Sequence, residues 1–299
     1  MLKYLDKSQD PNINLHEKDV LTCAQDSSKM SSPRLLNQSN TEEVADSFQQ
    51  LSLGIGHKEE NALSIFKPPL SRPPRSQKKL LILDINGVLV DIVSPSPKER
   101  KADINIARRA VFKRPFYLDF LKFCFERFEV GIWSSRNRKN VSKMVDYLIG
   151  DMKHRLLFCW DLSYCTASGF STLENKHKHL VFKELRRLWE KQDPNLPWEQ
   201  GDYNESNTVL LDDSPYKALL NPPHTAVFPY SYTFLDEKDT LLGTGGALRV
   251  YLEGLAEAEN VQKYVVRNPF GQTPISEGSV SWDFYHMVLL NFHSFPSTI

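Results

Sequence analysis

Apolar residues occur along the chain in short runs that polar residues separate. The most continuous run covers residues 80–83 and ends directly at Asp84, with a glycine three positions later. Four consecutive aliphatic residues followed by a turn signal predict a strand that is buried on both faces. Residues 208–211 repeat this pattern and end at Asp212. Further runs predict strands over residues 128–133, 156–160 and 226–229.

Segments with apolar residues at helical spacing lie between these strands. They predict helices that begin at Arg114-Pro115 and at Asn137, and helices over residues 178–190 and about 240–263. Proline suits the first turn of a helix because its missing N–H would have no partner there. Strands that alternate with helices predict an α/β fold with a doubly wound, mostly parallel sheet.

Composition divides the chain into three parts. Residues 1–76 are rich in Ser, Asn, Gln and Asp and end in a Pro-rich stretch, which predicts a disordered tail and a stiff linker. We expect one folded domain over residues 77–265. Residues 266–299 contain Pro, Gly and aromatic residues without a clear period. We expect them to form a C-terminal extension that packs on the domain.

Charge and cysteine content narrow the partners and the compartment. The 37 basic residues balance the 37 acidic residues, so no global field indicates direct binding of nucleic acid. No apolar run is long enough for a membrane span, and the first residues lack the apolar core of a signal peptide. The four cysteines form no CxxC pair, which favours reduced thiols in the nucleus or cytoplasm. Acidic residues in the N-terminal part argue against mitochondrial import.

Candidate chemistry lies where the two strongest strands end. The carboxyl ends of parallel strands share one edge of a sheet, so Asp84 and Asp212 would meet there. A buried carboxylate is costly without a partner. Two carboxylates and the main-chain carbonyl of residue 86 would suit Mg²⁺, which prefers oxygen ligands. The alternative is that Asp212 or Asp213 caps a helix that begins at Ser214-Pro215.

These motifs, taken in chain order, resemble those of the haloacid-dehalogenase superfamily. The resemblance is greatest to its FCP-homology domain, the domain of RNA polymerase II C-terminal-domain phosphatases and NLI-interacting-factor-like proteins, and it covers roughly residues 78–265. The first motif begins at Asp84. The second motif matches Ser134, which Ser135 follows, and the fourth matches the sequence Asp212-Asp213-Ser214-Pro215.

The third motif of the family is a lysine that precedes an acid and a leucine at a helix. Lys183 fits this pattern, and Lys176 and Lys178 are nearby alternatives. The resemblance implies that Asp84 attacks phosphorus and forms an aspartyl phosphate. The residues implied to hold the phosphate are Ser134, Ser135 and Lys183. The implied ligands of a Mg²⁺ cofactor are Asp84, the carbonyl of Asn86, Asp212 and Asp213.

The chain departs from the family at Asn86, where active members carry a second aspartate. That aspartate protonates the leaving alkoxide and then activates water. An amide has no proton to exchange near neutral pH, although its main-chain carbonyl remains available to a cation. Losing a positioned acid or base lowers a rate by about 10²–10⁴. We therefore expect metal and phosphate binding to persist while proton transfer is lost.

Two functions are compatible with this pattern. The first is a Mg²⁺-dependent phosphatase of the phosphoserine/phosphothreonine class that acts on a phosphoprotein and is impaired by Asn86. The second is a catalytically inactive module that binds a protein partner in the same groove. The presequence-translocase receptor subunit of the mitochondrial inner membrane is a precedent within the family, but its role usually accompanies a membrane span and a transit peptide, which we do not expect here. The sequence leaves the oligomeric state open.

Overall fold

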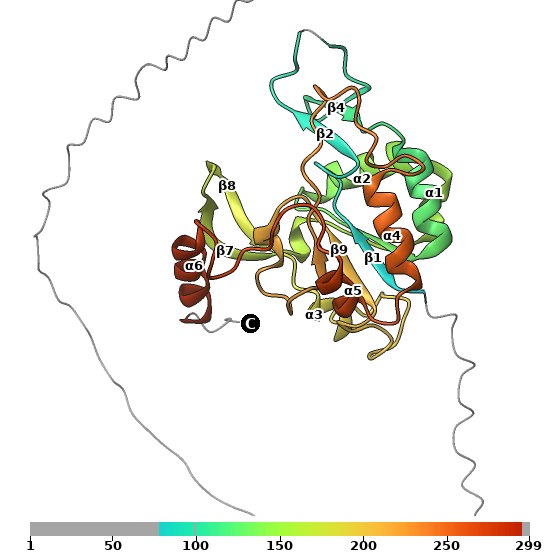
Figure 1. The fold of residues 1–299 in the computed structure, drawn as a ribbon. Coiled ribbons are helices and arrows are strands. Elements are labelled where there is room, and N and C mark those ends of the chain that lie inside the picture. Colours follow the sequence, from blue (N-terminus) through green and yellow to red (C-terminus); the bar gives the residue numbers. More distant parts are fainter. Residues whose placement is uncertain (1–77, 99, 295–299) are drawn as a thin grey trace, which may run out of the picture. The chain divides into compact units, whose positions relative to one another are not determined.

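The computed structural model describes residues 78–98 and 100–294, and the predicted tail over residues 1–76 lies outside them. A central sheet is flanked by helices, and two smaller sheets extend from it (Figure 1). Within the described residues, no helix combines the length and the apolar character that crossing a membrane requires. The described cysteines Cys124, Cys159 and Cys165 are free thiols.

The central sheet has five strands, all parallel, in the order β10-β9-β1-β5-β6. Their bounds are Leu80–Leu83 for β1, Glu129–Trp133 for β5, Leu156–Trp160 for β6, Thr208–Leu211 for β9 and Ala226–Val227 for β10. The first strand lies in the middle and pairs with β5 on one side and β9 on the other. The predicted α/β fold with a parallel central sheet is confirmed.

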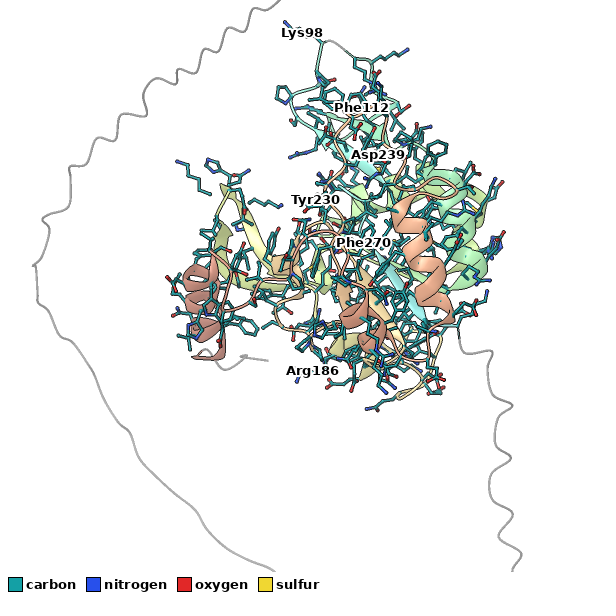
Figure 2. All side chains as sticks on the ribbon, in the orientation of Figure 1. Lys98, Phe112, Arg186, Tyr230, Asp239 and Phe270 are labelled. Atoms are coloured by element: carbon teal, nitrogen blue, oxygen red, sulfur yellow. The ribbon has the colours of Figure 1, made fainter. Side chains whose placement is uncertain are left out.

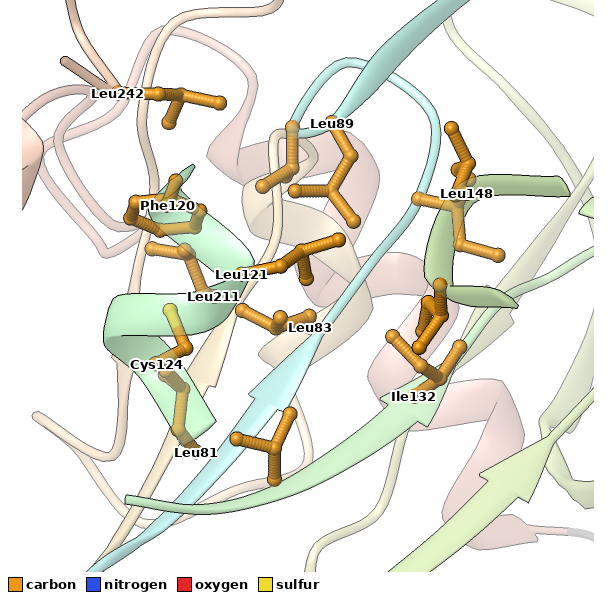
Figure 3. Packing of buried hydrophobic residues seen from close by; sticks show 14 of the residues in the cluster. Leu81, Leu83, Leu89, Phe120, Leu121, Cys124, Ile132, Leu148, Leu211 and Leu242 are labelled. Carbon is orange, nitrogen blue, oxygen red and sulfur yellow. The ribbon is translucent and has the colours of Figure 1, made fainter. Parts of the chain in front are cut away.

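Alternate side chains of β1 enter two different cores. Leu81 and Leu83 pack in the larger core, which Figure 3 shows from close by. Leu80 and Ile82 point to the opposite face, where they pack in a second core rich in tryptophan. Side chains alternate along a strand, so this division shows that β1 is covered on both faces, as its unbroken apolar run predicts.

Four helices contribute to the larger core. They are α1 (Tyr117–Arg127), α2 (Arg138–Ile149), α4 (Ala247–Glu257) and α5 (Val261–Arg267). The α2 helix begins as predicted, because the side chain of Asn137 accepts a hydrogen bond of 3.0 Å from the N–H of Asn140. Phe116, predicted to lie in the first helix, instead precedes α1 in a left-handed conformation, with φ +63° and 51% of its surface exposed.

The structure contradicts two of the helices that the sequence predicts. Residues 178–190 do not form one helix: strand β8 (Asn175–Phe182) occupies the first part, and the short helix α3 (Arg186–Trp189) follows. The helix expected over about 240–263 is replaced by α4 and α5. Asn260 caps the start of α5 by accepting a hydrogen bond of 2.9 Å from the N–H of Lys263, so the chain turns between the two helices.

Two small antiparallel sheets were not predicted. The first has the order β2-β4-β3, with bounds Val90–Val93 for β2, Ile104–Ile106 for β3 and Arg109–Lys113 for β4. The second is a hairpin of β7 (Thr166–Thr172) and β8, against which α6 (Trp282–Ser294) packs through Tyr285 and Val288. The remaining elements are the 3₁₀ helices η1 (Gly150–Arg155), η2 (Leu162–Tyr164) and η3 (Pro215–Ala218).

Arg114, which precedes α1, links the loop after β1 to the loop that carries Asp239. The guanidinium of Arg114 donates to both carboxylate oxygens of Asp239 at 3.0 and 2.6 Å, and their side chains are only 3% and 10% exposed. Figure 2 labels Asp239 below the three-stranded sheet. The same guanidinium lies 3.3 Å from the carbonyl oxygens of Gly87 and Val88, to which it also donates. Arg114 therefore fixes the position of the loop that carries the first motif.

Candidate active site

The parallel pairing of β1 with β9 brings two aspartates to one edge of the sheet. Leu83 lies opposite Leu211 in the register, so Asp84 and Asp212 follow at the same level. The N–H of Asp84 donates to the carbonyl of Leu211 at 2.9 Å, which extends the pairing past the strand end. One carboxylate oxygen from each of Asp84, Asp212 and Asp213 lies within 4.8 Å of the others. The structure thus gathers three carboxylates that are distant in sequence.

Asp212, like Asp213, does not cap η3, because the N-cap residue is Ser214 and η3 has no side-chain capping hydrogen bond, so the structure contradicts the capping alternative for Asp212. Its Oδ1 accepts a hydrogen bond of 3.0 Å from the N–H of Ser214, the residue before η3. Asp213 is held differently, because its Oδ1 accepts from the hydroxyl of Ser214 at 2.9 Å and its Oδ2 accepts from that of Ser231. Both aspartates therefore hold the turn before η3 and also belong to the carboxylate cluster.

Ser134 lies at the end of β5, the strand next to β1. Its N–H donates to the carbonyl of Trp160 at 3.0 Å, and its hydroxyl oxygen accepts a long contact of 3.4 Å from the N–H of Arg136. Ser134 is buried, and Ser135 is partly exposed. Both serines line the same cavity as Asp84. Their proposed role in holding phosphate stays a prediction, but their position suits it.

Lys183 lies at the end of β8 rather than in a helix, and its ammonium is fully buried. Its Nζ is 2.5 Å from Oδ2 of Asp212 and 3.3 Å from Oδ1 of Asp84. The alternatives Lys176 and Lys178 both lie in the exposed part of the same strand, and of these two only Lys178 lines the cavity. Lys183 is therefore the lysine of the three that reaches the carboxylates.

A second buried lysine, which the sequence did not predict, lies at the site. Lys217 lies in η3, and its Nζ is 2.8 Å from Oδ2 of Asp84, 2.8 Å from Oδ1 of Asp212 and 3.9 Å from Oδ1 of Asp213. The available signal was its position five residues after Asp212, where a tight helical turn after Ser214-Pro215 returns the chain toward the strand end. The sequence predicts that turn but does not show that its lysine faces inward.

Two ammonium groups and three carboxylates set the charge states at the site. Burial alone would raise the pKa of Asp84, but the ammonium groups of Lys183 and Lys217 outweigh it and hold that pKa below its ordinary value. Burial and the charge of Asp84 raise the pKa of Asp212 against the attraction of the same lysines. Burial lowers the pKa of Lys217, yet Asp212 and Asp84 reverse this effect and keep its ammonium charged.

Asp84 differs from its neighbours in having one free oxygen. Its Oδ2 accepts a hydrogen bond from Lys217, whereas its buried Oδ1 has no hydrogen-bond partner among the described residues. The ammonium of Lys183 lies 3.3 Å from Oδ1. An ionised carboxylate oxygen whose lone pairs accept no hydrogen bond is suited to act as a nucleophile.

Asn86 uses its side chain to hold the neighbouring small sheet. Its Oδ1 accepts a hydrogen bond of 3.0 Å from the N–H of Ile92 in β2. The next residue, Gly87, has φ +80°, and a Cβ at this position would overlap the carboxylate of Asp213. A glycine here thus lets Asp213 approach the loop, while Asn86 still lines the cavity beside Asp84.

The site opens into a cavity of about 430 Å³. Asp84 and Lys217 line it, together with residues from the ends of the sheet, β4 and the β7–β8 hairpin. Basic and imidazole side chains line it, namely Arg109, Arg136, His177, Lys178 and His179. Burial and the nearby charge of Arg109 lower the pKa of Arg136. This concentration of cationic side chains favours an anionic ligand.

The carboxylate cluster fits a divalent cation in the chemistry of its donors. Asp84, Asp212 and Asp213 offer carboxylate oxygens, which Mg²⁺ prefers, and burial limits competing water. The main-chain carbonyl of Asn86 belongs to the same loop. One feature opposes the fit, because the ammonium of Lys217 already bridges two of the three carboxylates.

Comparisons with known proteins identify a family model and several relatives that match this chain. Residues 79–262 match the family model described as NLI interacting factor-like phosphatase. An FCP1 homology domain-containing protein of Schizosaccharomyces pombe is 27% identical over 64% of this chain and 78% of its own length. The ubiquitin-like domain-containing CTD phosphatase 1 of Xenopus tropicalis is 25% identical over 74% of this chain and 66% of its own length. Its Homo sapiens counterpart is 27% identical over 56% of this chain and 49% of its own length.

The chain thus spans between half and two thirds of the length of these two curated phosphatases. Two solved structures of the RNA polymerase II CTD phosphatase Fcp1 also match, one of them the fission yeast protein bound to beryllium fluoride. Both are 15% identical to this chain and cover 73% of it, with 64% and 63% of their own chains aligned and TM-scores of 0.35 and 0.34.

Proposed function

Because the chain belongs to the family of NLI interacting factor-like phosphatases, we propose that its folded part is a phosphoprotein phosphatase domain that acts through Asp84. The proposed substrate is a phosphoserine or phosphothreonine side chain. The relatives whose names describe CTD phosphatases support a protein substrate. The open, cation-lined cavity above Asp84 supports it as well, because a phosphorylated side chain could enter it.

The observation that carries this proposal is the free Oδ1 of Asp84. This oxygen is buried, has no hydrogen-bond partner among the described residues, and lies 3.3 Å from the ammonium of Lys183. Attack by Oδ1 forms a bond to phosphorus, while the bond from phosphorus to the substrate oxygen breaks and that oxygen keeps the electron pair. The product of this step is an aspartyl phosphate at Asp84.

The surrounding residues stabilise charge on the transferred group. In this proposal Lys183 attracts the phosphoryl oxygens, and the hydroxyl of Ser134, which lines the cavity, donates a hydrogen bond to one of them. Mg²⁺ held by Asp84, Asp212, Asp213 and the carbonyl of Asn86 would supply further neutralisation of the phosphoryl charge. In the second step water attacks phosphorus, and the bond to Oδ1 of Asp84 breaks, which releases inorganic phosphate.

Asn86 limits both steps. The departing substrate oxygen needs a proton when it is an alkoxide, and the attacking water must lose one. Asn86 lines the cavity, but an amide does not ionise near neutral pH and so cannot act as a general acid or base there. We therefore expect slow turnover of phosphoserine and faster first-step reaction with an aryl phosphate, whose leaving group needs no proton.

Turnover of p-nitrophenyl phosphate in the presence of Mg²⁺ tests the proposal. Replacing the nucleophile in Asp84→Asn should abolish phosphate release, because an amide oxygen cannot form the covalent intermediate. The matched control is Asp119→Asn, which removes the same charge from an exposed position in α1. Unchanged turnover in Asp84→Asn would refute the proposal.

The same residue Asn86 favours a second candidate function. A domain that binds a protein partner in this cavity needs the shape and charge of the site but not the proton carrier. In that case the natural chain, Asp84→Asn and Asn86→Asp would all show the same background rate with the aryl phosphate. A rate that depends on Asp84 favours the enzyme instead.

A further inference from the structure

We infer that Lys217 is a built-in competitor for the divalent cation at this site, so that its ammonium and the metal ion exclude each other between Asp84 and Asp212. The inference rests on the proposed use of the three carboxylates as cation ligands. It does not depend on turnover, because it concerns what occupies the carboxylates before any substrate binds.

The first support is the position of the ammonium. Lys217 Nζ lies 2.8 Å from one oxygen of Asp84 and 2.8 Å from one oxygen of Asp212, and it faces Asp213 at 3.9 Å. All three residues that could hold a metal therefore direct an oxygen at this one nitrogen. The side chain of Lys217 is only 4% exposed, so water does not screen these contacts.

The second support is steric and electrostatic. Mg²⁺ binds carboxylate oxygens at roughly 2.0–2.1 Å, so an ion shared by Asp84 and Asp212 would occupy the space that Lys217 Nζ fills. The cluster contains three carboxylates, and Lys183 and Lys217 already compensate two of their charges. A cation entering beside both ammonium groups would meet strong repulsion at close range. Binding is favoured only if the ammonium of Lys217 leaves.

The third support is that hydrogen bonds fix the backbone of Lys217, whereas its side chain borders the open cavity. The carbonyl of Lys217 accepts a hydrogen bond of 2.8 Å from the N–H of Lys183, and its N–H donates to the carbonyl of Ser214 at 3.1 Å. Lys217 also lines the cavity. Its ammonium can therefore leave the carboxylates by side-chain rotation toward the cavity, without moving η3.

Binding of Mn²⁺ to the full-length chain, stripped of metal, tests this competition. Electron paramagnetic resonance measures free Mn²⁺ directly, and Mn²⁺ accepts the same oxygen ligands as Mg²⁺. Lys217→Met removes the ammonium and keeps a chain of similar length. Its Mn²⁺ affinity should rise by about tenfold or more over that of the natural chain, because one nearby positive charge is lost. The matched control Lys178→Met removes a charge at the cavity wall that does not contact the carboxylates.

Thermal unfolding gives a second readout. Without metal, Lys217→Met leaves three clustered carboxylates with one ammonium partner, so its unfolding temperature should fall below that of the natural chain. Added Mn²⁺ should raise the unfolding temperature of Lys217→Met more than that of the natural chain. If Lys217→Met does not fold without metal, Lys217→Gln serves instead, because its amide still donates hydrogen bonds to the carboxylates.

Equal Mn²⁺ affinity in the natural chain and Lys217→Met would overturn the inference, and so would a complete lack of binding in both. An equal rise in Lys178→Met would also overturn it, since the effect would then reflect total charge. These outcomes are separate from the proposed function. Turnover that depends on Asp84 would still support the phosphatase if Lys217 had no effect on Mn²⁺.

Discussion

Replacing Asn86 by aspartate would add the proton carrier that the proposed mechanism needs. The change is nearly isosteric, and the structure indicates that the fold tolerates it. Oδ1 of Asn86 accepts a hydrogen bond of 3.0 Å from the N–H of Ile92, and a carboxylate oxygen accepts the same bond. The second oxygen of Asn86→Asp would take the place of the amide nitrogen and could carry a proton to or from the reacting group.

The expected magnitude follows from the role of a positioned acid or base. Such a group contributes about 10²–10⁴ to a rate, which corresponds to about 3–5 kcal/mol in activation free energy. Asn86→Asp should therefore raise turnover of a phosphoserine peptide by about 10²–10⁴. The gain with p-nitrophenyl phosphate should be smaller in the first step, because that leaving group departs without a proton.

The two steps can be separated with the aryl substrate. In the natural chain the first step needs no proton carrier, whereas hydrolysis of the aspartyl phosphate does. We therefore expect a burst of nitrophenol equal to about one molecule per chain, followed by slow steady release. Asn86→Asp should remove the burst and raise the steady rate, since its second step is no longer limiting.

Stopped-flow absorbance measures the burst, and release of inorganic phosphate measures the steady rate. Asn86→Ala is the control, because it loses the contact with Ile92 and gains no proton carrier. Its stability should fall by about 0.5–1.5 kcal/mol, while its rate stays at or below that of the natural chain. If Asn86→Asp remains properly folded and shows no gain over Asn86→Ala with either substrate, the reasoning about the missing proton carrier is wrong.

Two further predictions concern the scaffold that positions the site. Gly131→Ala should destabilise the fold by about 1–3 kcal/mol in urea unfolding, because its Cβ would overlap the ring of Phe158. The double variant with Phe158→Leu should recover part of this loss, and strict additivity would contradict the contact. Arg114→Met should cost about 3–5 kcal/mol, because it leaves the carboxylate of Asp239 buried without its partner. Arg114→Lys should recover only part of this, since lysine cannot form both hydrogen bonds, and full recovery would contradict that geometry.

The sequence predicted the central sheet because its signals are local. The apolar runs before Asp84 and Asp212 are continuous, and each has a carboxylate at its end. Parallel strands with both faces covered produce such runs whatever the distant contacts are. The meeting of the two aspartates then follows from strand direction alone. The first helix begins at Tyr117 instead of Arg114-Pro115, and this difference does not affect where the two aspartates lie.

The small sheets were missed because their sequences lack the usual signals. The β3–β4 hairpin turns at Ala107 and Arg108, which have φ +50° and +62°, whereas glycine or asparagine usually marks such a turn. The first half of β8 is exposed and polar, so no alternation of apolar and polar residues indicates a strand there. The sequence instead predicts that its basic residues begin a helix, and this prediction also places Lys183 in a helix.

The burial of Lys217 could not be predicted from the sequence. A lysine is exposed in most proteins, and the position of Lys217 five residues after Asp212 indicates a turn back toward the strand end but not full burial. Its place between Asp84 and Asp212 depends on how η3 turns back over the strand ends. The charge balance of the site, and with it the behaviour of any metal ion, therefore required the three-dimensional structure.

Transfer of a phosphoryl group to Asp84 would change the mass of the chain, so mass spectrometry detects it. The natural chain is mixed with p-nitrophenyl phosphate and Mg²⁺, quenched in acid during the burst, and measured intact and after peptide digestion. We expect one added phosphoryl group, located at Asp84 and absent from Asp84→Asn. A burst with the label at another residue, or an equal label in Asp84→Asn, would contradict it.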